Sequence, residues 1–328
     1  MKRKTPNKRK SCKNMIYMAN PIYGGWVTFT AHLSLKFKYP LYKVGKRTEN
    51  FTREYGYGVK YKNISEHDLS KLNNVLVTAI DKHYYQYLDS LPKNTTIVIH
   101  DPTEVKTSEK CPNPLLKYLP KWNVITIRSA VKEYLFKTYK IKSTLMKHPF
   151  YLYSIPKQVS SGSYAISISR IDFDKNTDII LRANKLIKDS KRKVLLYGAE
   201  NRMYVHHKLE SLNFKKYWKG RFNKTLPPSI KKNTNILGGV KYMVDLSVIK
   251  NDGGGTQYTF LEAIHQGCCL ILHKKWVNQP KSIFKHGFNC LAIETPEELA
   301  TILNKNMNVN TLVSNSKKIL NSHIRVVW

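Results

Sequence analysis

The chain has 328 residues, and 41% of them are hydrophobic, which is the apolar content of a globular protein. This length can bury a sizeable core and suits two domains of ordinary size. No apolar run approaches the ~20 residues that a membrane span requires. The run MIYMA after the basic N-terminus is also too short for a signal peptide. Composition therefore excludes a membrane-spanning protein, and we expect no secretion.

Charge is the unusual property, because 56 Lys and Arg residues face only 22 Asp and Glu residues, for a formal net charge of +34. A charge of this sign and size predicts a polyanionic partner, such as DNA or an anionic membrane. Coding bias in an AT-rich genome is the alternative explanation for the many lysines. Such bias does not explain the scarcity of acidic residues, so we favour a real partner, with DNA first.

Five cysteines form an odd count without metal-ligand spacing: Cys12, Cys111, Cys268, Cys269 and Cys290. Cys268 and Cys269 fall in an apolar run and are most simply small buried hydrophobes. This usage predicts no metal site and a reducing compartment. That compartment is the cytoplasm or, for a viral protein, the cytoplasm or nucleus of the host cell.

The first half of the chain predicts an α/β domain. Residues 1–13 are a basic arm, which suits phosphate contacts or a nuclear-localisation-like patch. A strand over 14–19 then leads through Gly24 and Gly25 into a helix, which is the opening of a doubly wound domain. Further buried strands are predicted at 41–45, 73–80, 95–101 and 123–129, and helices at 82–90 and 129–139. The basic, tyrosine-rich stretch 46–68 is predicted to be a loop at the ligand edge of the sheet.

His100 and Asp101 end the predicted strand 95–101, just before Pro102. Ligands of open α/β sheets bind beyond the carboxyl ends of the strands, so this pair is a candidate for catalysis. The alternative is an N-cap or turn aspartate beside an incidental histidine.

A boundary is predicted within 151–162, where Pro, Ser and Gly accumulate. We therefore divide the chain into the arm 1–13, an N-terminal domain 14–155, a second α/β domain 156–305 and a C-terminal helical segment 306–328. Strands of the second domain are predicted at 163–169, 193–199, 242–249, 268–272 and 289–294. Thr177 and Thr295 are predicted to cap the helices that follow them.

Arg170 and Lys175 lie on one predicted strand-exit loop, five residues apart. In the cleft between two such domains, an Arg fork and a Lys point charge suit a diphosphate. Chance proximity in so basic a chain is the alternative.

Three glycines at 253–255 precede a helical pattern that Gly267 ends. A glycine-rich helix start exposes free backbone N–H groups and the positive end of the helix dipole, both of which favour a phosphate. Glu262 lies inside this helix, where it could turn towards a sugar hydroxyl. The alternative is a loop followed by a surface glutamate, since a glycine cluster alone is a weak signal.

Together these segments resemble GT-B glycosyltransferases, and in particular the retaining, family-4-like group. SISR-IDFD-K matches the family's R-x4-K through Arg170 and Lys175, and TFLEAIHQG matches its L-E-A helix through Glu262. The resemblance implies an α/β fold of two facing Rossmann-like, doubly wound parallel-sheet domains with a cleft between them. It also implies that Arg170 and Lys175 hold the diphosphate of a nucleotide-sugar, most simply a UDP-sugar, without a metal or other cofactor. Glu262 would contact the ribose or the sugar.

The same resemblance implies the remaining donor contacts. The turn at Gly24 and Gly25 is similar to the family's glycine loop, which approaches the donor phosphates. Gly254 stands where the family often has a second glutamate, so backbone N–H groups near it are expected to contact the donor sugar. The expected donor-binding set is Gly24, Gly25, Arg170, Lys175, Gly254, Gly255, Thr256, Gln257, Tyr258 and Glu262.

A closer resemblance is to the DNA α-glucosyltransferases of T-even phages, an outlying GT-B group, through MIYMANPIYGGWVTF, VIHDPTE and QYTFLEAIHQG. With the charge, it implies sugar transfer to a hydroxymethylated pyrimidine in DNA. His100 and Asp101 would orient the acceptor hydroxyl or take its proton, and the basic segments 1–13, 43–53 and 215–232 would follow DNA phosphates. Two alternatives stay open: a glycosyltransferase that builds a surface glycan or glycoprotein, and a non-catalytic nucleic-acid-binding α/β protein.

Overall fold

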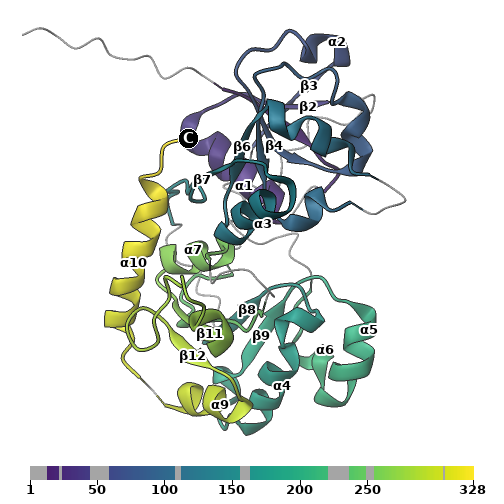
Figure 1. The fold of residues 1–328 in the computed structure, drawn as a ribbon. Coiled ribbons are helices and arrows are strands. Elements are labelled where there is room, and N and C mark those ends of the chain that lie inside the picture. The colour runs from purple at the N-terminus through teal and green to yellow at the C-terminus, as the bar shows by residue number, and fades with distance from the viewer. Residues whose placement is uncertain are drawn as a thin grey trace, which may run out of the picture.

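The computed structural model describes residues 13–21, 24–44, 59–107, 112–155, 163–220, 236–248, 255–305 and 307–328. Two parallel sheets, of seven and five strands, form the centres of two stacked domains (Figure 1). The predicted α/β class with two doubly wound sheets is therefore confirmed. None of the helices in these ranges is both long and apolar enough to cross a membrane.

The N-terminal sheet has the strand order β3-β2-β1-β4-β5-β6-β7, and every pair is parallel. Its strands are β1 (Asn14–Met18), β2 (Leu41–Val44), β3 (Lys62–Ile64), β4 (Val75–Ile80), β5 (Thr96–Ile99), β6 (Asn123–Thr126) and β7 (Thr144–Leu145). All six residues of β4 are buried, as expected for an apolar central strand covered on both faces. The order reverses between β1 and β4, which makes the carboxyl ends of these strands the switch point of the sheet.

The helices of this domain are α1 (Gly25–Phe37), α2 (Glu66–Leu69) and α3 (Ser129–Tyr139), joined by 3-10 turns at Lys82–Tyr87, Pro102–Val105, Pro114–Lys117 and Leu119–Lys121. The predicted helix at 82–90 is a short 3-10 helix instead, and the side chain of Asp81 caps it. The predicted loop 46–68 was wrong for its last part, which holds β3 and most of α2. Residues 46–58 lie outside the described residues.

The C-terminal sheet has the order β12-β11-β10-β8-β9, again parallel throughout. Its strands are β8 (Ala165–Ile168), β9 (Val194–Tyr197), β10 (Tyr242–Asp245), β11 (Cys269–His273) and β12 (Leu291–Ile293). The order reverses between β8 and β10, so the exits of these two strands flank the second switch point.

The main helices of this domain are α4 (Thr177–Leu186), α7 (Tyr258–His265) and α9 (Pro296–Asn304), and shorter ones are α5 (Arg202–Tyr204), α6 (Phe214–Tyr217) and α8 (Lys274–Val277). Thr295 caps α9 in a capping box, as predicted. The predicted cap at Thr177 was wrong: Thr177 is the first helical residue, and Asn176, in the left-handed conformation that Asn tolerates, precedes it.

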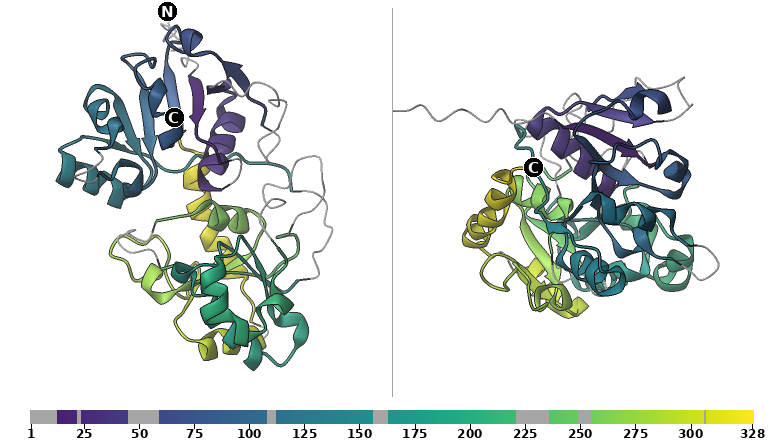
Figure 2. Two further views of the ribbon diagram at one scale, coloured as in Figure 1. Left: turned by 90° about the vertical axis from the view of Figure 1, so that its right-hand side faces the viewer. Right: turned by 45° about the horizontal axis from the view of Figure 1, so that its top comes forward.

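The C-terminal helix α10 (Asn310–Ile324) runs along both domains, and the chain beyond it returns to the N-terminal domain (Figures 1 and 2). There Trp328 packs against Phe29 of α1, with ring centroids 5.1 Å apart. The indole N–H of Trp328 donates to the carbonyl of Lys147, and the Tyr39 hydroxyl donates to the Trp328 carbonyl. The last residues thus complete the core of the first domain.

Candidate active site

The exits of β8 and β10 meet at the switch point of the C-terminal sheet. Lys175 is 7% exposed, and its Nζ lies 3.0 Å from Ser247 Oγ and 3.2 Å from Asp174 Oδ2. Arg170 is on the same exit, but its side chain is 60% exposed. The structure therefore brings the two predicted cations together, one held inside the loop and one at the surface.

Aspartates partly neutralise this cation pair. Arg170 contacts Asp172 at 2.9 Å and Asp174 at 3.6 Å, so Asp174 is shared by both cations. An ammonium has three N–H donors and a guanidinium has five. Counting only contacts to the described residues, one donor of Lys175 and most donors of Arg170 stay available to an anion, while the aspartates fix where both side chains lie.

Asp245 is the last residue of β10, two residues before Ser247. Its Oδ1 accepts from the Ser247 backbone N–H at 2.9 Å, while Oδ2 is buried and has no hydrogen-bond partner among the described residues. Burial raises the pKa of Asp245, and the charge of Lys175 opposes that rise. Lys175 is therefore buried beside the carboxyl groups of Asp174 and Asp245, which keep its ammonium group in place.

Gly198 directly follows β9, and the β8 exit passes so close to it that no side chain fits there. A Cβ built at Gly198 would lie 1.7 Å from the carbonyl oxygen of Ser169, next to Arg170. Any side chain at this position would push the β8 exit away from its observed place.

The start of α7 is the second predicted anion site. The N-cap residue of this helix, Gln257, makes no side-chain cap hydrogen bond, and its side-chain nitrogen is buried without a partner among the described residues. A Cβ built at Gly255 would meet nothing within 4 Å, so space is open beside it. Thr256 is buried. Gly253 and Gly254 lie outside the described residues.

Glu262 and Tyr258 do not face open space. Glu262 is 1% exposed, and its two carboxylate oxygens contact His32 Nε2 at 3.0 Å and the Tyr153 hydroxyl at 2.9 Å. The Tyr258 hydroxyl donates to the Pro149 carbonyl at 2.8 Å. We expected Glu262 to turn towards a sugar, but tertiary packing turns it towards α1 and the segment that joins the domains.

The glycine turn of the N-terminal domain leads into α1. Gly24 has φ 104°, a conformation that favours glycine, and no side chain caps the helix. A Cβ built at Gly24 or Gly25 would meet nothing within 4 Å. The first turn of α1 also contains no acidic residue, so its N-terminus keeps its partial positive charge.

His100 and Asp101 lie at the carboxyl end of β5. His100 is buried, with Nε2 2.7 Å from the Thr78 carbonyl oxygen, and burial lowers its pKa to about 4. The Asp101 Oδ1 accepts from the Thr103 backbone N–H and hydroxyl, so the N-cap interpretation is correct for this residue. The other oxygen, Oδ2, lies 3.9 Å from Arg128, and the Asp101 side chain is 41% exposed.

Glu104 was missed by sequence reasoning, although it lies between the two predicted parts of this site. It accepts from the Trp26 indole at 3.0 Å and from the His100 backbone N–H at 3.1 Å, and it is 9% exposed. Burial raises the pKa of Glu104 to about 8, although both hydrogen bonds lower it. Nothing in the local sequence signals this role, because Trp26 is 78 residues away.

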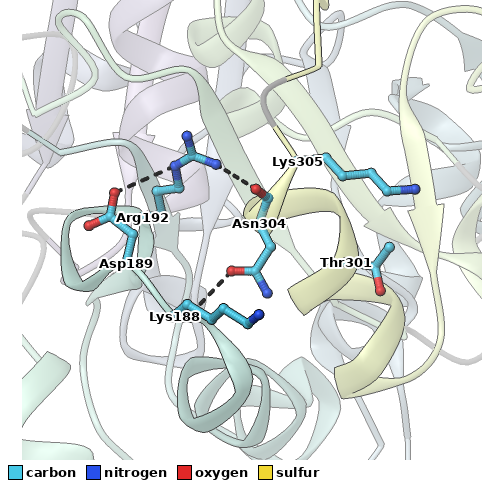
Figure 3. A pocket seen from close by; sticks show the side chains of 6 residues that line it. All are labelled: Lys188, Asp189, Arg192, Thr301, Asn304 and Lys305. Atoms are coloured by element: carbon cyan, nitrogen blue, oxygen red, sulfur yellow. Dashed lines mark hydrogen bonds and ion pairs between the residues drawn. The ribbon is translucent and has the colours of Figure 1, made fainter.

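A surface hollow of the C-terminal domain lies away from these residues. It has a volume of about 400 Å³ and is lined by Lys188, Asp189, Arg192, Thr301, Asn304 and Lys305 (Figure 3). These residues precede β9 and end α9, so the hollow is at the amino ends of the strands. Ligands of open α/β sheets bind at the carboxyl ends, so we do not assign the site here. Among the described residues, no group of three His, Cys, Asp or Glu side chains is placed to hold a metal ion.

At the level of sequence alone, no protein family and no curated protein matches the chain. Among solved structures, the fold is similar to that of Anabaena HepE in complex with UDP, with a TM-score of 0.65 at 12% identity over 95% of this chain and 96% of that chain. A phage α-glucosyltransferase in complex with UDP and a 13-mer DNA with a central A:G mismatch gives the same four values. A glycosyltransferase from Rickettsia africae gives a TM-score of 0.60 at 12% identity over 96% of both chains. This chain thus has the GT-B fold of glycosyltransferases.

Proposed function

We propose that this protein transfers a sugar from a UDP-sugar to the hydroxyl of a hydroxymethylated pyrimidine in DNA, with retention of the anomeric configuration. The observation that carries the proposal is the pair Arg170 and Lys175, held together at the switch point between β8 and β10. Two cations in that position suit the diphosphate of a nucleotide-sugar. Three proteins of similar fold are glycosyltransferases or bind UDP by their own descriptions.

The donor would lie mainly on residues 156–305, and the acceptor would approach residues 14–155. Arg170, Lys175 and the N-terminus of α7, with Gly254, Gly255, Thr256 and Gln257 before its first residue, would hold the diphosphate as it leaves. Gly24 and Gly25 would approach the phosphates from the other domain. Tyr258 and Glu262 belong to this set as the residues that fix α7. The charges of the side chains and helix N-termini supply this stabilisation without calling on a metal or other cofactor.

In the transfer itself, the bond between the anomeric carbon and the diphosphate oxygen breaks, and UDP leaves. The acceptor oxygen bonds to the same carbon, and its proton passes to a base. Asp101 suits this role because its side chain is partly exposed at the carboxyl end of β5. His100 is neutral near pH 7, because its pKa lies near 4, so we assign it to orienting the site.

A DNA acceptor is supported by the +34 charge and by the phage enzyme of similar fold, which was captured with UDP and DNA. The basic segments 1–13, 43–53 and 215–232 would contact phosphates, although residues 1–12, 45–53 and 221–232 lie outside the described residues. We place the reaction in a reducing compartment, the cytoplasm or, for a viral protein, the cytoplasm or nucleus of its host. An anionic glycan would also attract this surface, so a glycosyltransferase of surface glycans or glycoproteins is the second candidate.

The test is to incubate the purified protein with UDP- and GDP-sugars and duplex DNA, either unmodified or carrying hydroxymethylpyrimidines, and to weigh the digested nucleosides by mass spectrometry. A hexose-sized or pentose-sized gain on the modified base alone is the expected result. Donor hydrolysis without any change in a nucleoside would move the acceptor to a glycan or protein. A third outcome is that no donor is turned over and that Arg170→Ala and Glu262→Ala bind donor as the wild type does. This outcome would favour a non-catalytic nucleic-acid-binding protein.

A further inference from the structure

A buried histidine joins the two domains behind the proposed site. His32 lies on α1 of the N-terminal domain, and its Nε2 is 3.0 Å from Glu262 Oε1 on α7 of the C-terminal domain. Both side chains are almost fully buried, at 1% and 2% exposure. A hydrogen-bonded pair in such a place contributes more than a surface contact, because neither group has water as a substitute partner.

The segment between the domains fixes the direction of this hydrogen bond. The Tyr151 backbone N–H donates to His32 Nδ1 at 3.0 Å, so Nδ1 carries no proton and the Nε2 proton points to Glu262. The Tyr153 hydroxyl donates to the other oxygen of Glu262 at 2.9 Å, and the Tyr153 carbonyl lies 2.8 Å from His265 Nε2. Three parts of the chain therefore meet at one carboxylate.

Aromatic rings hold the imidazole from both sides. The His32 ring stacks on Tyr258 with centroids 4.7 Å apart and on Phe150 with centroids 4.6 Å apart. Rotation of α1 against α7 would have to break this stack as well as the hydrogen bonds. The contacts of His32 with Glu262 and with these two rings, which we call the joint, therefore resist movement of one domain against the other.

The joint is also close to both predicted phosphate-facing helix starts. His32 follows Gly25 by seven residues, and Glu262 follows Tyr258 by four, which places the joint about 10 Å and about 6 Å along the two helices. A small tilt of α1 against α7 at the joint would therefore displace the backbone N–H groups at the starts of these helices.

We propose that His32 is a positioning residue. By acting through Glu262, it fixes the N-terminal ends of α1 and α7 relative to each other, so that both can contact one nucleotide-sugar. This inference rests on the proposed function. It assigns to Glu262 an effect on the donor through position, without direct contact to the ribose or sugar. His32 and Glu262 therefore act as one pair, and a change in either residue is expected to alter the affinity for the nucleotide-sugar.

The test is a double-mutant cycle on UDP binding by calorimetry and on UDP-glucose turnover. His32→Leu and Glu262→Leu are each expected to weaken UDP binding about tenfold, the usual scale of coupling between sites. The double variant should be no weaker than the weaker single variant, because both remove the same joint. His32→Gln, whose amide nitrogen can still donate to Glu262, should recover most of the affinity and the KM.

A matched control separates positioning from general loss of stability. Asn184 is fully buried within the C-terminal domain and makes two hydrogen bonds to the backbone of Val194, so Asn184→Leu loses as many bonds away from the joint. This variant should keep the UDP affinity of the wild type despite a lower melting temperature. If Glu262→Leu weakens UDP binding while His32→Leu does not, Glu262 is a direct ligand and the inference is wrong. If the wild type binds no UDP and Arg170→Ala changes nothing, the proposed function itself fails, and this inference with it.

Discussion

Lys175 Nζ lies 3.0 Å from Ser247 Oγ, so a cation of the β8 exit is held by a hydroxyl of the β10 exit. The bond crosses the switch point of the C-terminal sheet, where the order of strands reverses. The backbone reinforces it, because the Val248 N–H donates to the Asp174 carbonyl at 2.8 Å. The proposed diphosphate site is thus built by joining two strand exits and not by one loop alone.

Lys175 and Arg170 should separate stability from donor binding. Lys175→Met leaves Asp174 and Asp245 without their buried cation, so it should lower the free energy of unfolding by about 1–3 kcal/mol and weaken UDP binding at least about tenfold. Arg170 is mostly exposed, so Arg170→Ala should change stability by less than about 0.5 kcal/mol but still weaken UDP binding. Urea denaturation and calorimetry measure the two effects. Unchanged UDP affinity in both variants would remove the pair from the donor site.

Gly198 and Gly255 should respond oppositely to the same substitution. Gly198→Ala places a methyl group against the Ser169 carbonyl, so we expect a loss of at least about 2 kcal/mol in the free energy of unfolding. Gly255→Ala meets no atom within 4 Å, so its stability should stay near that of the wild type. If a diphosphate lies against Gly255, however, the added methyl group should weaken UDP binding. A Gly198→Ala protein with an unchanged melting temperature would contradict the observed approach of the two strand exits.

Glu104 should make stability fall as pH rises towards 8. Its pKa is raised from 4.5 to about 8 in the folded protein, so between these values the folded state holds a proton that the unfolded chain has lost. The stabilisation is therefore complete below pH 4.5 and lost as pH rises through about 8. Glu104→Gln is neutral at every pH, so the difference in melting temperature between wild type and variant should shift in the variant's favour over this range.

A surface glutamate provides the control for this experiment. Glu297 is exposed on α9, so Glu297→Gln should keep the wild-type dependence of melting temperature on pH. Parallel curves for the wild type and Glu104→Gln would show that Glu104 ionises in the folded protein as it does in the unfolded chain.

A DNA acceptor should make binding steeply dependent on salt. A protein that contacts six to ten phosphates loses about 10³–10⁵ in affinity between 50 and 200 mM salt, because bound counterions are released. We expect a loss of this size for duplex DNA, measured by fluorescence anisotropy, and a much smaller loss for UDP. A shallow salt dependence for DNA would favour the glycan or glycoprotein acceptor.

Periodicity predicted most of the fold because the strands are buried on both faces. The runs at 14–19, 73–80 and 123–129 are mainly apolar, the last two are also rich in β-branched residues, and they contain β1, β4 and β6. The strand β3 was missed since two of its three residues, Lys62 and Asn63, are polar and exposed at the edge of the sheet. Edge positions carry no apolar signal, so a pattern of buried residues cannot find them.

In the candidate site, too, residues with a local sequence signal were found, and residues with distant partners were missed. Arg170 and Lys175 were found because their spacing is local, and the structure places them around a shared Asp174. His32 and Glu104 were missed because their partners, Glu262 and Trp26, are 230 and 78 residues away along the chain. For Glu262, the local pattern identified the residue but not the direction of its side chain.

By itself, the sequence determined the class of fold, the order of most strands and helices, the basic charge and the glycine-led start of α1, whereas α7 begins three residues after Gly255. These properties depend on neighbours within a few positions, where side-chain period and backbone freedom act directly. Only the tertiary structure decided that Lys175 is buried against Ser247 and that Glu262 faces His32 instead of open space. Burial and hydrogen-bond partners arise where distant segments pack together, so no local pattern records them.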